Sequence, residues 1–268
     1  MKKRLNPFGF RLSLAALLFS TLLLLCSINL AGRTEGAKRQ DRSQQNKQTY
    51  MRVVEQGTLT GTINFLGEAP PRKMIDESAD MVCMQMNPKA RTEDVIVTDG
   101  RLANVLVYVQ SGSALDAYQF ETPAEEAVLE HKRCRYAPHV QGIQTGQTLK
   151  IINSDQTVHN IHPTPKVNQE WNMSQGIDAP PILKQFSSPE LLIPFKCNQH
   201  PWEKAYVGVF EHPFFAVSAR DGSYRIEGLP AGTYTIAAWH ERFATKSVQV
   251  TIAPHESRTL DFSFAAEK

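Results

Sequence analysis

Residues 221–240 read DGSYRIEGLPAGTYTIAAWH, and this stretch decides the fold class. It holds two runs rich in β-branched and aromatic residues, which turn-forming residues separate at 229–232. Residues 58–66 show the period-two alternation that is typical of a strand. An amphipathic helix is suggested only by the short run 122–130. The sequence therefore predicts an all-β chain built of sandwiches. Further strands are expected at 103–110, 149–152, 206–210, 214–219, 246–253 and 258–264.

Composition and charge exclude one class of function. The chain has 268 residues, of which 41% are apolar and 21% charged, a balance typical of a folded protein. Its 29 Lys and Arg residues against 27 Asp and Glu residues give a formal net charge of +2. A nucleic-acid-binding protein would carry a concentrated basic stripe. The sequence therefore predicts no nucleic-acid partner.

The N-terminal segment predicts the cellular location. Four basic residues precede an uncharged, Leu-rich run at 12–31, which is the pattern of a signal peptide. The run is also long enough to remain as an uncleaved membrane anchor. Leucines occupy positions 23–25 before Cys26, where a lipoprotein signal has a small residue, and this argues against a lipoprotein. We expect residues 1–31 to be a signal peptide or anchor and residues 32–56 a linker. The protein is then periplasmic or otherwise extracytoplasmic, and it contacts the membrane only if this segment stays uncleaved.

Export makes the cysteines informative, because disulfides form in oxidising compartments. Three cysteines remain beyond Cys26, so one has no partner within the chain. Cys83 and Cys134 lie in ordinary loop contexts and are the expected disulfide pair. Cys197 is expected to stay reduced, as a free thiol or a metal ligand.

A candidate metal site lies in the middle of the chain. The strand-like run 147–153 leads to His159, and Cys197 follows with His200 three residues beyond it. One thiolate and two imidazoles form the trigonal ligand set that copper prefers in electron-transfer sites. Half of a zinc site is the alternative, but it would need a second pair, and only His159 and His162 offer one.

These residues resemble the cupredoxins, the amicyanin-like members above all. The resemblance rests on GQTLKIINSD at 146–155, on HN at 159–160 and on CNQHPW at 197–202. It implies a Greek-key sandwich with copper as the cofactor and with His159, Cys197 and His200 as in-plane ligands. It also implies that Asn160 ties the histidine strand to the cysteine loop.

One position departs from the cupredoxin pattern, because Glu203 stands where the resemblance places an axial Met. A carboxylate there is harder than a thioether, so as a fourth ligand it would favour Cu(II) and lower the reduction potential. Two alternatives stay open: Glu203 faces solvent, or Met173 supplies the axial contact. His162 is expected to point outward. The other histidines are expected on the surface or in loops, at 131, 139, 212, 240 and 255.

The residues on both sides of the copper motif resemble a second family. Residues 221–236, together with the strand-like runs 57–66 and 104–109, resemble the carboxypeptidase regulatory-like domain, a seven-stranded prealbumin-type sandwich. Its opening strands precede the copper motif and its remaining strands follow it. Residues 57–110 and 213–268 are then parts of this sandwich, and residues 111–212 are the cupredoxin-like domain, either inserted or consecutive. The family name implies no peptidase activity.

The function expected from the sequence is an exported, mononuclear copper protein that transfers electrons to or from an unidentified redox partner protein. It is not expected to be an enzyme, because no nucleophile elbow, phosphate loop or HExxH motif occurs. Electrons would pass through His200, whose ring edge would emerge in an apolar patch. The alternative is a non-redox module that binds envelope carbohydrate or mediates adhesion, with a structural or degenerate metal site.

Overall fold

The computed structural model describes residues 48–50 and 55–266. The chain divides into two units, 1–47 and 48–268, and the described residues all belong to the second unit. The predicted signal peptide or anchor and most of the predicted linker lie outside the described residues. Within the described residues, no helix is long and apolar enough to cross a membrane. Strands dominate this part of the chain, which confirms the predicted all-β class.

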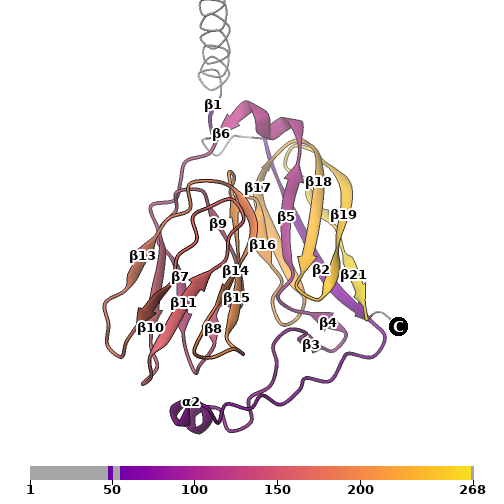
Figure 1. Cartoon of the computed structure of the whole chain (residues 1–268). Coiled ribbons are helices and arrows are strands. Elements are labelled where there is room, and N and C mark those ends of the chain that lie inside the picture. Colours follow the sequence, from indigo (N-terminus) through magenta and orange to yellow (C-terminus); the bar gives the residue numbers. More distant parts are fainter. Residues whose placement is uncertain (1–47, 51–54, 267–268) are drawn as a thin grey trace, which may run out of the picture. The chain divides into compact units, whose positions relative to one another are not determined.

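Strands between residues 127 and 210 form two sheets, which we call the central sandwich (Figure 1). One sheet has the order β13 (Ile182–Lys184), β10 (Leu149–Asn153), β7 (Ala127–His131) and β8 (Tyr136–Ala137). The other has the order β12 (Met173–Gln175), β11 (His159–Pro163), β14 (Glu190–Lys196), β15 (Lys204–Phe210) and β9 (Val140–Gln144).

A shared apolar core joins the two sheets of the central sandwich. It includes Leu129 and Ile151 from the first sheet and Ile161, Phe195 and Val207 from the second, each inaccessible to solvent. The pairs β7–β10 and β9–β15 are parallel and not sequential, so the chain crosses between sheets. This is the predicted cupredoxin-like Greek-key arrangement.

Strands between residues 56 and 111, together with those after residue 210, form two further sheets, the flanking sandwich. One sheet has the order β16 (Phe215–Val217), β5 (Leu106–Ser111), β18 (Gly232–His240) and β19 (Phe243–Ile252). The other has the order β17 (Ser223–Pro230), β2 (Gln56–Leu66), β4 (Arg101–Leu102) and β3 (Val97–Thr98), and β20 (Ser257–Thr259) and β21 (Phe262–Ala265) also pair with β2. The motif at 221–240 thus forms β17 and β18, as predicted, but in different sheets.

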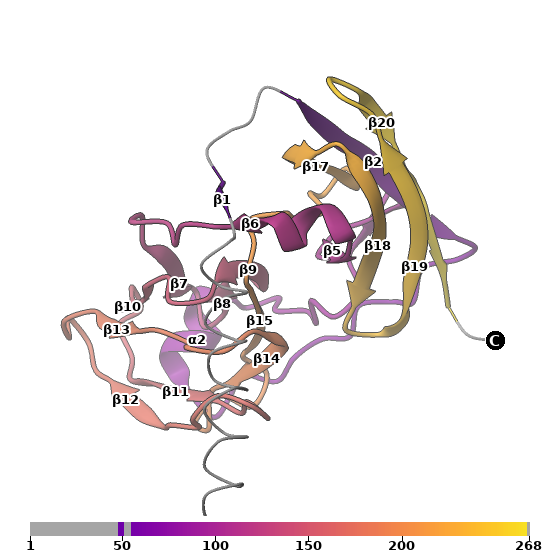
Figure 2. The same ribbon diagram turned by 90° about the horizontal axis from the view of Figure 1, so that it is seen from above.

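Packing links the two sandwiches, which lie side by side in Figures 1 and 2. Leu106 and Ala237 of the flanking sandwich form a buried cluster with Val140 and Phe210 of the central one. At this contact Gly142 lies so close to the Phe215 ring that a Cβ atom would approach it to 2.4 Å. A side chain at Gly142 would therefore disturb the junction.

Short elements complete the described chain. A 3-10 helix, η1 (Ser113–Ala117), precedes β6 (Tyr118–Gln119), which pairs with β1 (Gln48–Thr49). The helix suggested at 122–130 is wrong, because residues 127–131 form β7 and pair in parallel with β10. Burial of Leu129 between the sheets outweighs the local helical pattern there. The α-helix among the described residues, α2 (Met81–Met86), was not predicted and lies at one end of the central sandwich (Figure 1).

Candidate metal centre

The four predicted ligands come from one strand and one loop of the central sandwich. His159 begins β11, and Cys197, His200 and Glu203 lie in the loop between β14 and β15. The antiparallel register Lys196↔Lys204 closes this loop, inside which Cys197 N donates to Glu203 O at 3.2 Å. All four side chains are buried, none being more than 3% exposed. The structure therefore brings together every ligand predicted from the sequence.

The ligand atoms converge on one point. His159 Nδ1 lies 3.0 Å from His200 Nδ1, and Cys197 Sγ lies 3.6 Å from His200 Nδ1. Glu203 Oε2 lies 2.9 Å from His159 Nδ1 and 3.8 Å from His200 Nδ1. Metal–nitrogen and metal–sulfur bonds of about 2.0 and 2.3 Å place tetrahedral ligands roughly 3.3–3.8 Å apart. The four ligand atoms, from one thiol, two imidazoles and one carboxylate, all lie within 4.8 Å of one another, so a small inward or outward adjustment lets them hold a single metal ion.

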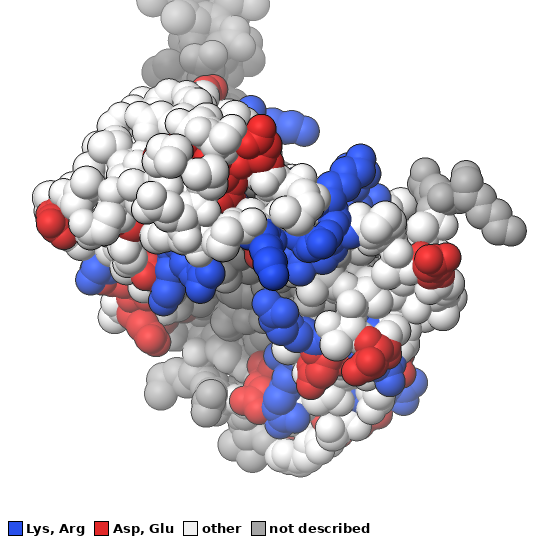
Figure 3. All heavy atoms as spheres, turned by 90° about the horizontal axis from the view of Figure 1, so that it is seen from below, with Lys and Arg blue, Asp and Glu red and all other residues white. Residues whose placement is uncertain are grey.

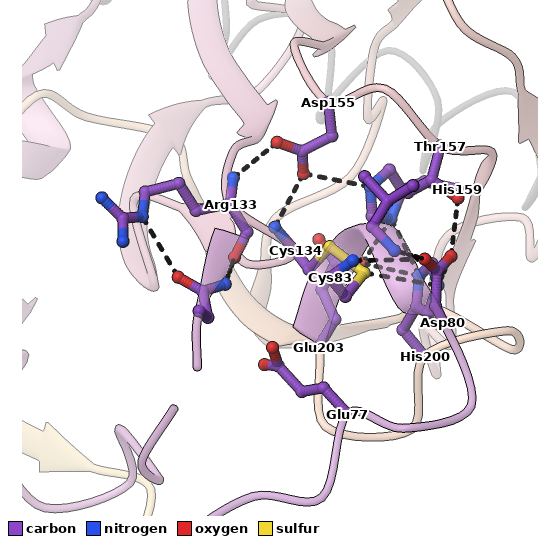
Figure 4. Close-up of a disulfide and its surroundings, with 12 residues drawn as sticks. Glu77, Asp80, Cys83, Arg133, Cys134, Asp155, Thr157, His159, His200 and Glu203 are labelled. Carbon is purple, nitrogen blue, oxygen red and sulfur yellow. Dashed lines mark hydrogen bonds and ion pairs between the residues drawn. A yellow bond between two sulfur atoms is a disulfide. The ribbon is translucent and has the colours of Figure 1, made fainter. Parts of the chain in front are cut away.

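Carboxylates hold the far side of both imidazoles. His159 Nε2 lies 3.1 Å from Asp155 Oδ2, and His200 Nε2 lies 3.1 Å from Asp80 Oδ2 (Figure 4). A proton on each Nε2 leaves the Nδ1 lone pair free to face the centre. The two carboxylates therefore set the tautomer and the ring orientation that metal binding requires.

Asp80 connects the site to helix α2. Its Oδ1 caps the helix by accepting from Val82 N at 2.8 Å and Cys83 N at 3.2 Å, while Oδ2 accepts from Thr157 Oγ1 at 2.6 Å. The predicted disulfide between Cys83 and Cys134 is confirmed, and it fastens this helix to the central sandwich.

Helix α2 also corrects the prediction that the His200 ring edge emerges in an apolar patch. His200 is only 3% exposed, and its Nε2 faces Asp80 and Cys83 Sγ, the latter at 3.7 Å. The covering segment lies 120 residues before His200 in the sequence, so no local pattern could show it.

A further histidine belongs to the site. His131 Nδ1 hydrogen-bonds Glu203 Oε1 at 2.8 Å, and its ring stacks on that of His159 at 4.3 Å. Its Nε2 is buried without a hydrogen-bond partner. The expected surface or loop position of His131 is wrong, because the side chain is inaccessible to solvent. Period-two alternation with buried Leu129 is the signal that could have found it.

Other histidine predictions have mixed outcomes. His139 lies in the loop between β8 and β9, as expected, although its side chain is buried against Glu241 of the flanking sandwich. His240 in β18 is buried, against expectation, because its ring packs on Phe243 and Phe264. His255 is exposed and His212 is half-buried. His162 lies at the rim, where it contacts Glu170 and Asn198.

The structure distinguishes between the alternatives for Glu203. The side chain is 1% exposed and so does not face solvent, whereas Met173 is 39% exposed. The structural link expected of Asn160 is confirmed. Its backbone N–H donates to Cys197 Sγ at 3.3 Å, and its Oδ1 accepts from Asn198 N at 3.2 Å.

Electrostatics favour the anionic forms of the sulfur and oxygen ligands. Burial opposes ionisation of Cys197, but hydrogen bonds from His159 and His200 outweigh it and lower the thiol pKa to about 7. Burial likewise opposes the charge on Glu203, yet hydrogen bonds from His131 and His159 lower its pKa. For His159, burial is outweighed by hydrogen bonds to Asp155, Cys197 and Glu203, which raise its pKa to about 11. A thiolate formed near neutral pH is the species that binds soft metals.

A comparison with protein-family models gives a match in the C-terminal part of the chain. A model of the carboxypeptidase regulatory-like domain matches residues 198–265. No curated protein matches the chain in sequence.

Copper proteins and cupredoxins are among the solved structures that resemble part of the chain. A Cu-containing nitrite reductase from Thermus scotoductus SA-01 is 18% identical, with 38% of this chain and 27% of that chain covered and a TM-score of 0.30. A purple cupredoxin from Nitrosopumilus maritimus is 20% identical, with 31% of this chain and 98% of that chain covered and a TM-score of 0.27. A variant of amicyanin in the Cu(I) form is 19% identical, with 38% of this chain and 97% of that chain covered and a TM-score of 0.28.

Proposed function

We propose that this protein is an exported, mononuclear copper protein that transfers single electrons. His159, Cys197, His200 and Glu203 would hold the ion, and copper would supply the one-electron redox chemistry. The observation that carries the proposal is the convergence of one thiol, two Nδ1 atoms and one carboxylate oxygen, all within 4.8 Å of one another.

The donor set favours copper over zinc. Structural zinc sites are built mainly from four Cys and His ligands, whereas one thiolate with two imidazoles is the set used by mononuclear electron-transfer copper. The outer contacts of Asp155 and Asp80 hold both rings in place whatever the oxidation state of the ion. A rigid ligand set keeps the structural change at each electron transfer small.

Trp202 provides a short connection from the site to the surface. Its ring packs on that of His200, with centroids 5.2 Å apart, and the side chain is half-buried. We propose that a redox partner protein docks at Trp202, since helix α2 covers the other edge of His200.

We propose no enzymatic activity and an extracytoplasmic location. Four protein ligands leave no open coordination position of the kind that catalytic metal sites keep. The Cys83–Cys134 disulfide suits an oxidising compartment, as does the basic and apolar N-terminal pattern. We further propose that the central sandwich is an insertion in the flanking one, since β2 and β5 pair with strands that follow residue 210.

One observation favours a second candidate, a non-redox module with a structural metal. The site is closed on every described side, and closed sites are typical of structural metals. Such a module would act through another surface, with envelope carbohydrate as a possible ligand.

Redox cycling separates the two candidates. The full chain is loaded with Cu(II), its copper content is measured, and the bound ion is reduced with ascorbate and reoxidised with ferricyanide. We expect one copper per chain and repeated cycling without metal loss. Preferential binding of zinc, or copper that cannot be cycled in place, would contradict electron transfer and support the structural role.

A further inference from the structure

A basic pocket of about 490 Å³ lies beside the metal centre. Its walls are the segment that follows α2, the turn between β7 and β8, and residues 218–220 of the flanking sandwich. Lys and Arg side chains cross the middle of the face shown in Figure 3. The pocket is therefore a concave surface with positively charged residues in its walls.

Four guanidinium groups of the pocket have no carboxylate partner among the described residues. They belong to Arg72, Arg91, Arg133 and Arg220. The fifth arginine differs, because Arg135 pairs with Glu77 at 2.8 Å and with Glu93 at 3.7 Å. Guanidinium groups stay charged at any pH that a folded protein tolerates. Arg91, Arg133 and Arg220 are exposed, so solvent screens their mutual repulsion, and an anion that enters the pocket is attracted by several of these positive charges.

Hydrogen bonds to backbone and side-chain oxygens hold three of these arginines in place. Arg72 Nε donates to Thr92 O at 2.6 Å, and Arg91 Nη1 donates to Arg72 O at 2.8 Å. Arg133 donates through Nε to Asn87 Oδ1 at 3.1 Å and through Nη2 to Met86 O at 2.9 Å. Each guanidinium has five N–H groups, so several remain available to a ligand. Fixed donors lower the entropic cost of binding.

The size and lining of the pocket suit a small molecule. Volumes of about 300–1,000 Å³ are usual for such sites, which combine apolar walls with a few convergent polar groups. Here Ile96, Ala103, Tyr136 and Pro138 supply apolar surface. A single carboxylate, that of Glu93, lines the pocket and it already contacts Arg135.

We propose that the basic pocket binds a small polyvalent oxyanion, with two or more carboxylate or phosphate groups. Planar and tetrahedral oxyanions both match the paired donors of a guanidinium. This function does not depend on copper. The pocket nevertheless adjoins the metal centre, because the backbone N–H groups of Arg133 and Cys134 donate to Asp155, the partner of His159.

Calorimetric titration of the full chain tests the proposal, with pyrophosphate and tricarballylate as probes in about 0.15 M salt. The titrations are run with and without copper, because both probes chelate metals. We expect one binding event per chain in both forms. Replacing Arg72 and Arg220 together by Gln should weaken it at least about tenfold, as loss of paired hydrogen bonds predicts. A preference for one probe identifies the anion, carboxylate or phosphate, that the pocket favours.

Matched controls keep the test specific. Arg225 and Arg258 are exposed arginines outside the pocket, so changing both to Gln removes the same charge. This control should bind the probes as the unmodified chain does, and circular dichroism should show that both variants are folded. Absence of binding by both probes, or equal weakening in the control, would overturn the proposal. Tight binding only to long polyanions such as heparin would overturn it too, because the site would then be an open surface.

Discussion

The two sandwiches bury different kinds of side chain. The flanking sandwich has a core of aliphatic and aromatic residues, such as Leu59, Ile236 and Phe264. The central sandwich has a similar core but adds, at one end, a buried cluster of ionisable groups that includes Glu203, His159 and His131. The apolar cores account for folding in both cases, whereas the ionisable cluster is held by mutual hydrogen bonds and costs desolvation. Stability and metal binding should therefore respond to different substitutions.

Loss of the disulfide is the change with the largest expected effect. Replacing Cys83 and Cys134 by Ser removes a cross-link between two residues that are 51 positions apart in the sequence. Chain entropy predicts a decrease of about 4 kcal/mol in the free energy of unfolding. Urea denaturation measures it, with the exposed variant Ser113→Ala as a control. An unchanged denaturation midpoint would show that helix α2 is held by its other contacts.

A core substitution in each sandwich tests whether stability and copper binding depend on different residues. Ile236→Ala in the flanking sandwich and Ile193→Ala in the central one each remove a fully buried side chain. Each should cost about 2–5 kcal/mol of unfolding free energy. The copper spectrum should survive Ile236→Ala, because that residue lies outside the site. A bleached site in this variant would mean that the two regions are not separable.

Cys197→Ser should abolish metal binding without unfolding the chain. The variant removes the soft ligand, so copper affinity should fall by more than about 100-fold, beyond what loss of an outer partner costs. The sulfur-to-copper charge-transfer band should vanish. Absorption titration and thermal denaturation of the metal-free protein give the two readouts. Unaltered affinity and spectrum would exclude Cys197 as a ligand.

Asp155→Asn tests the outer contacts of the centre. It weakens the partner of His159 Nε2, so copper affinity should fall by about 10–100-fold. Asp116→Asn is the matched control, because Asp116 is exposed and lies in η1, outside the central sandwich. If both variants bind copper equally, the carboxylate does not position His159.

Glu203→Met should change copper affinity least among these variants. It should nevertheless change the reduction potential clearly. A thioether is softer and uncharged, so the reduction potential should rise and the absorption should shift toward that of a blue-copper site. Met173→Leu is the control for the exposed methionine. A potential and spectrum unchanged by Glu203→Met would show that the carboxylate is not a ligand.

Much of the fold could be predicted from the sequence, because strands carry a local signal. Alternation at 58–66 and the turn at 229–232 identified β2, β17 and β18. The close spacing of Cys197, His200 and Glu203 likewise identified one loop as the metal loop. Asp80 could not be found this way, since a distant segment brings it to His200 and only the folded chain joins them. His131 was missed because the pattern at 122–130 suggests a short helix, which hides the alternation of His131 with buried Leu129 in β7.

The central claim is that His159, Cys197, His200 and Glu203 bind one copper ion together. X-ray absorption of the copper-loaded full chain at the copper edge tests it most directly. The account predicts one sulfur, two imidazole nitrogens and one oxygen around the metal, with the sulfur lost in Cys197→Ser and the oxygen lost in Glu203→Met. A copper ion surrounded only by nitrogen and oxygen in the unmodified chain would contradict the account.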